Sequence, residues 1–161
     1  RSTLFPYTTL FRSRSYPGIP ELITALHRNS ILLAIASNKF QAGTEYLIKE
    51  FFPGIPFVAV LGNRPGFPLK PDPEIVSEVL RKAGVKKEDA VMVGDSPTDM
   101  RTAANGGIMG IAVGWGYRDM KDMTNWGIDP STLRAASGTA GSGTEFHLVE
   151  TVEELKKLLL P

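Results

Sequence analysis

The stretch AVMVGDSPTDMRTAANGG, residues 90–107, contains a complete transition from a β-strand to an α-helix. Its first four residues form a short apolar run without polar alternation, which is typical of a strand buried on both faces of a parallel sheet. Ser96 followed by Pro97 is typical of a helix N-terminus, and Gly106-Gly107 of a helix end. A strand that leads directly into a helix is the building unit of an α/β fold.

The same alternation extends in both directions from this stretch. Short apolar runs predict further strands at residues 31–37, 57–61, 108–113 and 146–149. Capping and periodicity signals predict helices at residues 20–27, 41–52, 73–84 and from Thr151 onward. In the second of these helices, Tyr46, Leu47, Glu50 and Phe51 lie near one face. A loop is predicted at 114–144, with a short helix after Pro130. Strands separated by helices predict right-handed β-α-β units and therefore a doubly wound parallel sheet.

The composition is that of an ordinary globular chain. Its 161 residues are 42% hydrophobic and 22% charged, include no cysteine and carry a formal net charge of +1. These values exclude a disordered chain, a coiled coil and a thiolate site, and they give no electrostatic reason to expect nucleic-acid binding. No apolar run approaches the roughly 20 residues that span a bilayer. We therefore expect one soluble, cytoplasmic domain.

Residues 1–15, RSTLFPYTTLFRSRS, differ from the rest of the chain. They contain three arginines and no acidic residue, and Pro6 and Tyr7 interrupt any run that a signal peptide would need. The segment TLFPYTTLFRS resembles the translation of an adapter used in short-read DNA sequencing. We expect residues 1–15 to be non-native and residues 16–161 to be the informative part; a natural disordered or strand-forming N-terminus is the alternative.

Polar residues follow two of the predicted strands at the end where ligands bind in such sheets. Ser37, Asn38 and Lys39 end the first strand, and the hydroxyl and amide of this run can donate to phosphate oxygens near a helix N-terminus. Taken alone, Ser37 or Asn38 is more often a simple helix cap. Asp95 is more informative, because helix formation does not require it there and a carboxylate at a strand end can bind Mg²⁺.

Lys70 and Asp99 have ordinary explanations when each is considered alone. Asp99 lies three residues after Ser96, so a capping box explains it fully. Lys70 precedes Pro71 in a loop, where the proline predicts an extended backbone and where most lysines are solvated. The sequence contains no P-loop, GxSxG, HExxH or Gly-rich dinucleotide signature.

Taken together, the order strand–SNK, loop–LKPDP and strand–VGDSPTD resembles the haloacid dehalogenase (HAD) superfamily, in particular its phosphoglycolate-phosphatase-like hydrolases. The resemblance covers residues 16–117, with a looser tail to Pro161. It implies a HAD-like Rossmannoid core and hydrolysis of a small phosphate monoester through an aspartyl-phosphate, with Mg²⁺ as cofactor. The implied partner is a small phosphorylated metabolite, with neither nucleic acid nor a membrane involved.

The resemblance also implies a role for each matching residue. Residues 37–39 bind phosphate, and the Ser37 hydroxyl bonds the phosphoryl group that is transferred. Lys70 neutralises the nucleophilic carboxylate and the phosphoryl oxygens. Asp95 is the Mg²⁺ ligand, and Asp99 steadies either the metal site or Lys70. Phosphoryl transfer depends largely on such positioning and charge neutralisation.

The chain departs from the family pattern at its start. The family's first motif, a strand ending in Asp-x-Asp-Gly-Thr, supplies the nucleophile and the general acid, and no Asp precedes Tyr16. In the family that strand is central, between the strands ending at Ser37 and Asp95, and a separate cap selects the substrate. We therefore expect this chain to lack both parts, to be inactive, and to fold poorly because two inner strand edges are exposed.

The sequence is also compatible with other functions. A chain without the nucleophile could be a genuine short protein that binds phosphate or Mg²⁺ without catalysis. Within the enzymes, a HAD phosphomutase or a dehalogenase is the alternative, although dehalogenation needs no Mg²⁺. The sequence predicts neither the substrate nor the oligomeric state.

Overall fold

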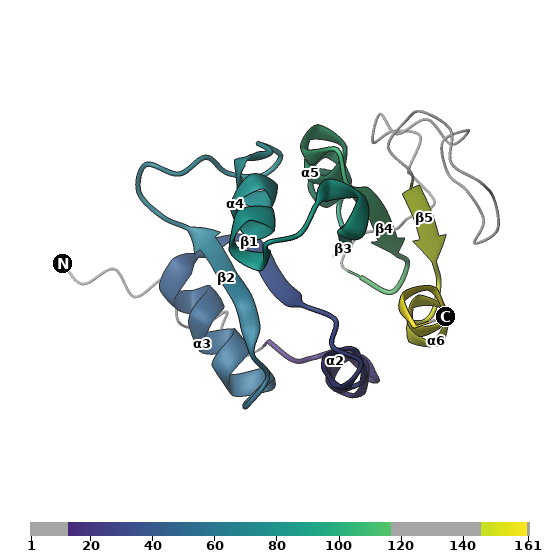
Figure 1. Cartoon of the computed structure of the whole chain (residues 1–161). Helices are drawn as coiled ribbons and strands as arrows, with labels where there is room; N and C mark the ends of the chain where they lie inside the picture. The colour runs from purple at the N-terminus through teal and green to yellow at the C-terminus, as the bar shows by residue number, and fades with distance from the viewer. Residues whose placement is uncertain (1–12, 117–145, 161) are drawn as a thin grey trace. The chain divides into compact units, whose positions relative to one another are not determined.

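The computed structural model describes residues 13–116 and 146–160 of the chain. The chain divides into two compact units, Arg1–Phe67 and Pro68–Pro161, each with its own parallel sheet (Figure 1). Helices alternate with the strands in both units. The α/β class and the parallel strand direction predicted from the sequence are therefore confirmed, with the strands distributed over two sheets.

The first unit is built around the parallel pair β1 (Leu33–Phe40) and β2 (Phe57–Asn63). Helix α2 (Ile19–Arg28) precedes β1, and α3 (Gln41–Phe51) connects β1 to β2. The β1 bounds differ from the prediction, because Ile31 and Leu32 are exposed and lie before the strand, which continues through Phe40 instead. An apolar run alone does not show where a strand acquires its hydrogen-bonding partner.

The buried face of α3 differs from the predicted one. Tyr46 and Glu50 are exposed, whereas Gly43 and Thr44 are buried. The reason is a close contact at the start of the helix, where the ring of Phe40 lies against the α-carbon of Gly43. A small residue thus forms the contact face, and hydrophobicity does not identify it.

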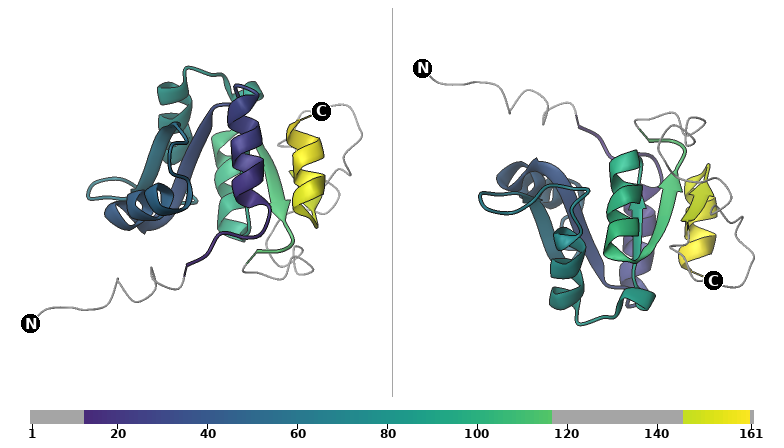
Figure 2. Two further views of the ribbon diagram at one scale, coloured as in Figure 1. Left: turned by 90° about the horizontal axis from the view of Figure 1, so that it is seen from below. Right: turned by 90° about the horizontal axis from the view of Figure 1, so that it is seen from above.

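The second unit contains a sheet of three parallel strands in the order β3-β4-β5. The strands are β3 (Val91–Gly94), β4 (Met109–Val113) and β5 (Phe146–Val149). The helices are α4 (Glu74–Ala83), the short 3₁₀ helix η1 (Lys87–Asp89), α5 (Pro97–Gly106) and α6 (Val152–Leu159), the last beside β5 (Figure 2). The predicted bounds agree closely, because local caps such as Ser96 and Gly107 determine them.

Helix α5 is the centre of the second unit and contacts β3, β4 and α4. Met100 is fully buried on the sheet side, beside Gly110 of β4. On the other side, a side chain at Gly106 would meet Val76 of α4 at 2.8 Å. Close packing on both sides leaves the helix little room to shift, and this fixes the position of its N-terminus.

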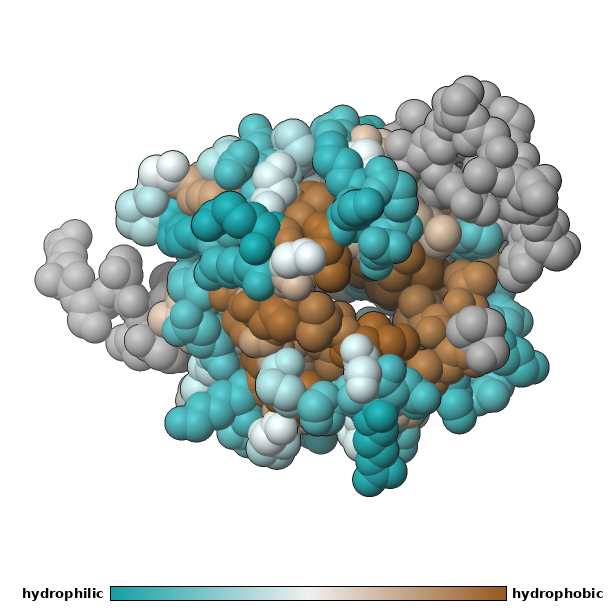
Figure 3. All heavy atoms as spheres, viewed as in Figure 1, coloured by the Kyte–Doolittle hydropathy of each residue, from teal (hydrophilic) through white to brown (hydrophobic). Residues whose placement is uncertain are grey.

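The predicted burial of β3 on both faces is wrong. Met92 is buried, but Val91 and Val93 on the opposite face are 42% and 40% exposed. Only β4, which has a hydrogen-bonded strand on each side within the described sheet, is buried along both faces. Apolar side chains accordingly reach the molecular surface, as the space-filling view illustrates (Figure 3). An apolar edge strand of this kind promotes pairing with other strands.

The predicted loop at 114–144, with the short helix after Pro130, lies almost wholly outside the described residues. Within residues 13–116 and 146–160, none of the helices has the length and hydropathy that crossing a membrane requires.

Candidate active site

The polar residues of the second unit gather where β3 ends and α5 begins. Ser96 has an extended backbone, with φ −141° and ψ 155°, and Pro97 occupies the first helical position, where it needs no N–H partner. The Ser96 hydroxyl accepts a hydrogen bond from the Asp99 N–H at 3.3 Å and donates to Asp99 Oδ2 at 2.7 Å. The Asp99 carboxylate therefore turns back over the helix N-terminus, where the helix dipole favours negative charge.

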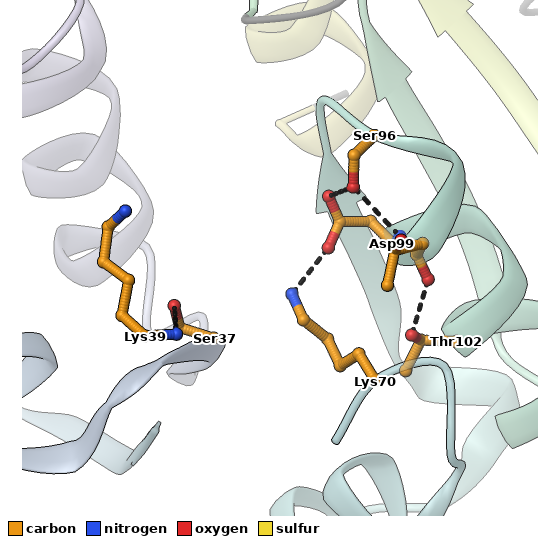
Figure 4. A network of polar contacts seen from close by, with 7 residues as sticks. Ser37, Lys39, Lys70, Ser96, Asp99 and Thr102 are labelled. Carbon is orange, nitrogen blue, oxygen red and sulfur yellow. Dashed lines mark hydrogen bonds and ion pairs between the residues drawn. The ribbon is translucent and has the colours of Figure 1, made fainter. Parts of the chain in front are cut away.

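A buried ion pair completes the surroundings of Asp99. Lys70 Nζ lies 2.6 Å from Asp99 Oδ1, and the two side chains are only 9% and 11% exposed. Figure 4 shows Lys70 reaching one carboxylate oxygen and Ser96 the other. A capping role therefore explains Asp99 only in part, because the same carboxylate holds a lysine from another segment.

Lys70 lies in a tight turn that contains Pro71. The Asp72 N–H donates to the Leu69 carbonyl at 3.0 Å, and the Lys70–Pro71 peptide bond inside this turn is cis. Asn105 of α5 donates to the Pro71 carbonyl at 2.8 Å. The turn is thus attached to the same helix that carries Asp99, which holds the lysine in place.

Two glycines pack directly against the acidic residues of this cluster. A Cβ added at Gly94 would lie 2.6 Å from Asp99 Cγ, and one at Gly116 would lie 2.7 Å from Asp95 Oδ2. Real Cβ atoms essentially never approach other atoms this closely. Both positions therefore require glycine for the carboxylates to keep their present places.

Asp95, directly after β3, provides a carboxylate, the kind of hard oxygen ligand that Mg²⁺ prefers. Within the described ranges, no set of three or more His, Cys, Asp and Glu residues could hold a metal ion. Mg²⁺ in proteins usually keeps several waters and takes one or two carboxylates together with substrate phosphate. The donor set fits a Mg²⁺ ion held by one carboxylate of this cluster, that of Asp95.

Residues 37–39 lie in the first unit, at the carboxyl end of β1. They interrupt the pairing of β1 with β2, since Ala36 pairs with Leu61 and the next pair is Phe40 with Asn63. The Lys39 N–H donates to Ser37 Oγ at 3.1 Å, which uses an acceptor position of the hydroxyl and leaves its hydrogen to donate (Figure 4). The predicted strand covered residues 31–37 with this run at its end, whereas β1 continues through Phe40 and residues 37–39 bulge within its last part.

The structure thus brings together two groups of the predicted site residues. Lys70 and Asp99 form one group, joined by Ser96, for which the sequence pattern predicts only a helix cap. Ser37, Asn38 and Lys39 form the other group, in the first unit. The signal for Ser96 was present in its spacing from Asp99, but the pairing of Lys70 with an acid 29 residues away has no local pattern.

Ser96→Ala is expected to lower the free energy of unfolding by about 2 kcal/mol, because it removes both a helix cap and a donor to a charged carboxylate. Thr151→Ala is the matched control: Thr151 caps α6 by accepting from the Glu154 N–H at 3.2 Å in an exposed hydrogen bond, whereas Asp99 belongs to a buried ion pair. Its loss is expected to be about 1 kcal/mol. Urea unfolding of both variants tests this difference, and equal losses would contradict it.

Comparison with known proteins identifies the family. Residues 8–113 match the family model described as haloacid dehalogenase-like hydrolase. Over 108 residues the chain is 41% identical to a phosphoglycolate phosphatase of Mesorhizobium japonicum, an alignment that covers 67% of this chain and 48% of that protein. A phosphoglycolate phosphatase of Rhodospirillum rubrum is 34% identical over 102 residues, or 63% of this chain and 42% of that one. The chain thus spans about half the length of these relatives.

Solved structures agree with this comparison. A candidate phosphoglycolate phosphatase from Lactobacillus delbrueckii subsp. bulgaricus has a TM-score of 0.74 at 32% identity, covering 90% of this chain and 53% of its own. CbbY from Rhodobacter sphaeroides, solved with xylulose-1,5-bisphosphate, has a TM-score of 0.60 at 27% identity, covering 71% and 52%. The resemblance inferred from residues 37–39, Lys70 and Asp95–Asp99 is therefore confirmed at the level of the family. The chain belongs to the haloacid dehalogenase-like hydrolases.

Proposed function

We propose that this chain is part of a Mg²⁺-dependent cytoplasmic phosphatase that hydrolyses a small phosphate monoester resembling phosphoglycolate. The observation that carries the proposal is the buried Lys70–Asp99 pair, which fixes an ammonium group at the N-terminal turn of α5, the helix that follows β3 and Asp95. A fixed cation near a hard metal ligand suits a phosphoryl group better than a neutral substrate. The relatives named phosphoglycolate phosphatase and the sugar bisphosphate bound to CbbY support this substrate class.

The family resemblance gives each candidate residue of the two units a task. The ammonium of Lys70 neutralises charge on the phosphoryl oxygens, and Asp99 holds that ammonium in place. The Ser37 hydroxyl donates to a phosphoryl oxygen beside the peptide groups of residues 38 and 39. Asp95 holds Mg²⁺, which supplies further neutralisation of phosphoryl charge when bound. The family resemblance assigns the nucleophile to an aspartate outside residues 16–161: its carboxylate attacks phosphorus as the P–O bond to the ester's alcohol breaks, the alcohol leaves with a proton, and water then hydrolyses the aspartyl-phosphate to inorganic phosphate and the free carboxylate.

The proposal includes an assignment of the chain's parts. Residues 16–161 form the C-terminal part of the HAD-like core, and residues 1–15 are a non-native translation of adapter sequence. The family match begins at residue 8, so part of that first segment lies within it. Sequencing the source DNA upstream of the Tyr16 codon tests this assignment directly, because a native coding sequence there replaces the adapter-like residues.

The experiment that tests the function uses a longer protein, the extended phosphatase, in which the native coding sequence found upstream of Tyr16 replaces residues 1–15. We expect Mg²⁺-dependent hydrolysis of 2-phosphoglycolate, no hydrolysis by the 161-residue chain alone, and a loss of roughly 100-fold or more in kcat for Asp95→Asn. Asp89→Asn, at an exposed acid in η1, is the control and leaves kcat unchanged. Phosphate binding without turnover of any ester would instead identify a non-catalytic module, and turnover by the 161-residue chain would refute its inactivity.

A further inference from the structure

The carboxyl end of β1 has an irregularity that the proposed chemistry does not explain. Between the pairs Ala36–Leu61 and Phe40–Asn63, the three residues 37–39 face the single residue Gly62 of β2. Extra residues in one strand bulge out of the ladder and leave backbone groups without their regular partners. The peptide groups beside such a bulge need other hydrogen bonds, since buried backbone donors and acceptors are nearly always satisfied.

The side-chain amide of Gln41 supplies two of these bonds. Its Oε1 accepts from the Gly62 N–H at 2.6 Å, and its Nε2 donates to the Val60 carbonyl at 2.8 Å. A residue of a neighbouring parallel strand bonds in the same way to the carbonyl and the N–H of two alternate residues. The Gln41 amide therefore stands in for a strand residue beside the bulge.

Contacts of Gly62 and Thr44 also hold the end of the bulge, at Lys39 and Phe40. A Cβ at Gly62 would lie 2.7 Å from the Gln41 α-carbon and 2.8 Å from the Lys39 carbonyl oxygen. The buried Thr44 hydroxyl lies 3.2 Å from the Phe40 carbonyl and 3.4 Å from that of Lys39. The end of the bulge is thus held between β2 and the first turn of α3.

We propose that Gln41 is a positioning residue for the phosphate-binding segment 37–39, acting by fastening the end of the bulge to β2. The inference rests on the proposed function, because that function assigns a phosphoryl ligand to the segment. Gln41 itself touches no ligand: its amide determines where the Ser37 hydroxyl and the following peptide groups lie. Small displacements of such groups weaken binding strongly, since ligand hydrogen bonds tolerate little misplacement.

The test compares Gln41→Met, which keeps the length of the side chain and removes its amide, with Glu45→Ala. Glu45 accepts from Gln41 Nε2 at 2.6 Å on the exposed side, so its loss leaves both bonds to β2 intact. Inorganic phosphate is titrated into the full chain while the amide signals of residues 37–39 and Gly62 are followed by NMR. These signals report the folded population, so a low folded fraction changes their intensity and not their position.

Gln41→Met is expected to weaken phosphate binding about tenfold and to accelerate hydrogen exchange at the Gly62 N–H, whereas Glu45→Ala changes affinity less than twofold. Gln41→Glu keeps the acceptor for the Gly62 N–H but not the donor to Val60, so its phosphate affinity is expected to lie between those of Gln41→Met and Glu45→Ala. It replaces Gln41→Met in the test if that variant fails to fold. In the extended phosphatase, Gln41→Met raises KM by the same factor.

The outcomes separate this inference from the proposed function. If the wild-type chain binds phosphate and Gln41→Met binds it equally well, the positioning role is overturned while the function stands. If Gln41 only stabilises the fold, Gln41→Met binds phosphate as the wild-type chain does and differs from it only in a lower urea midpoint of unfolding. If phosphate does not shift the signals of residues 37–39 in the wild-type chain, the assignment of the segment fails, and the positioning role fails with it.

Discussion

Replacing Lys70 with alanine is expected to lower the free energy of unfolding by about 3–5 kcal/mol. The Lys70 and Asp99 side chains are 9% and 11% exposed, so the substitution leaves a carboxylate buried without its cation. Ser96 still donates to one carboxylate oxygen, but a neutral hydroxyl does not balance the charge. Under the proposed function, the extended phosphatase is expected to lose activity as well, because the substitution removes the ammonium assigned to the phosphoryl oxygens.

A matched lysine and a second substitution make this prediction specific. Lys82 pairs with Glu78 at 3.3 Å in α4, and the Lys82 side chain is 42% exposed although that of Glu78 is only 10% exposed. Water therefore screens this pair at its lysine end, and Lys82→Ala is expected to cost less free energy of unfolding than Lys70→Ala. Adding Asp99→Asn to Lys70→Ala removes the uncompensated charge and is expected to recover part of the lost stability but none of the activity. Urea unfolding and phosphatase assays measure both quantities. A loss for Lys70→Ala no larger than that for Lys82→Ala would show that the buried pair contributes little.

Gly94→Ala is expected to cost about 3 kcal/mol, although it adds only one methyl group. The new Cβ would lie 2.6 Å from Asp99 Cγ, so the carboxylate must move away from both Ser96 and Lys70. Overpacking of this kind typically costs 1–3 kcal/mol, to which the disturbed ion pair adds. Thermal or urea unfolding measures the loss, and the extended phosphatase is expected to lose most of its kcat.

Gly84→Ala is the control for adding a methyl group at a glycine. Gly84 ends α4 with φ +68° and has open space around it, so alanine there meets a backbone cost of about 1 kcal/mol and no clash. If Gly94→Ala destabilises the protein no more than Gly84→Ala does, the close contact with Asp99 is not rigid and the carboxylate can adjust.

The elements predicted well from the sequence are those that local chemistry determines. Helix α5 begins at Pro97 and ends before Gly107 because its N-cap Ser96, the proline at its first position and the glycine after its last residue all lie within residues 96–107. Thr151 determines the start of α6 in the same way. These signals act within a few residues, so no knowledge of the tertiary structure is needed to interpret them.

The elements predicted poorly depend on contacts between distant segments. The burial of β3 depends on what covers Val91 and Val93, and its apolar run does not reveal that. The last part of β1 depends on the bonds from Gln41 to β2, 19 and 21 residues away. Lys70 was recognised as a site residue only through the family resemblance, because no local pattern relates it to Asp99.

The tight packing of α5 has a consequence for how this protein tolerates sequence change. Glycines face the helix or its neighbours at three places: Gly94 against Asp99, Gly106 against Val76, and Gly110 against Phe146 and Met100. A larger residue at Gly106 would meet Val76, and one at Gly110 would meet the Phe146 ring first and then Met100, so either change disturbs the packing that positions α5. In a saturation library of the extended enzyme, positions 106 and 110 should therefore be depleted as strongly as the acidic cluster itself.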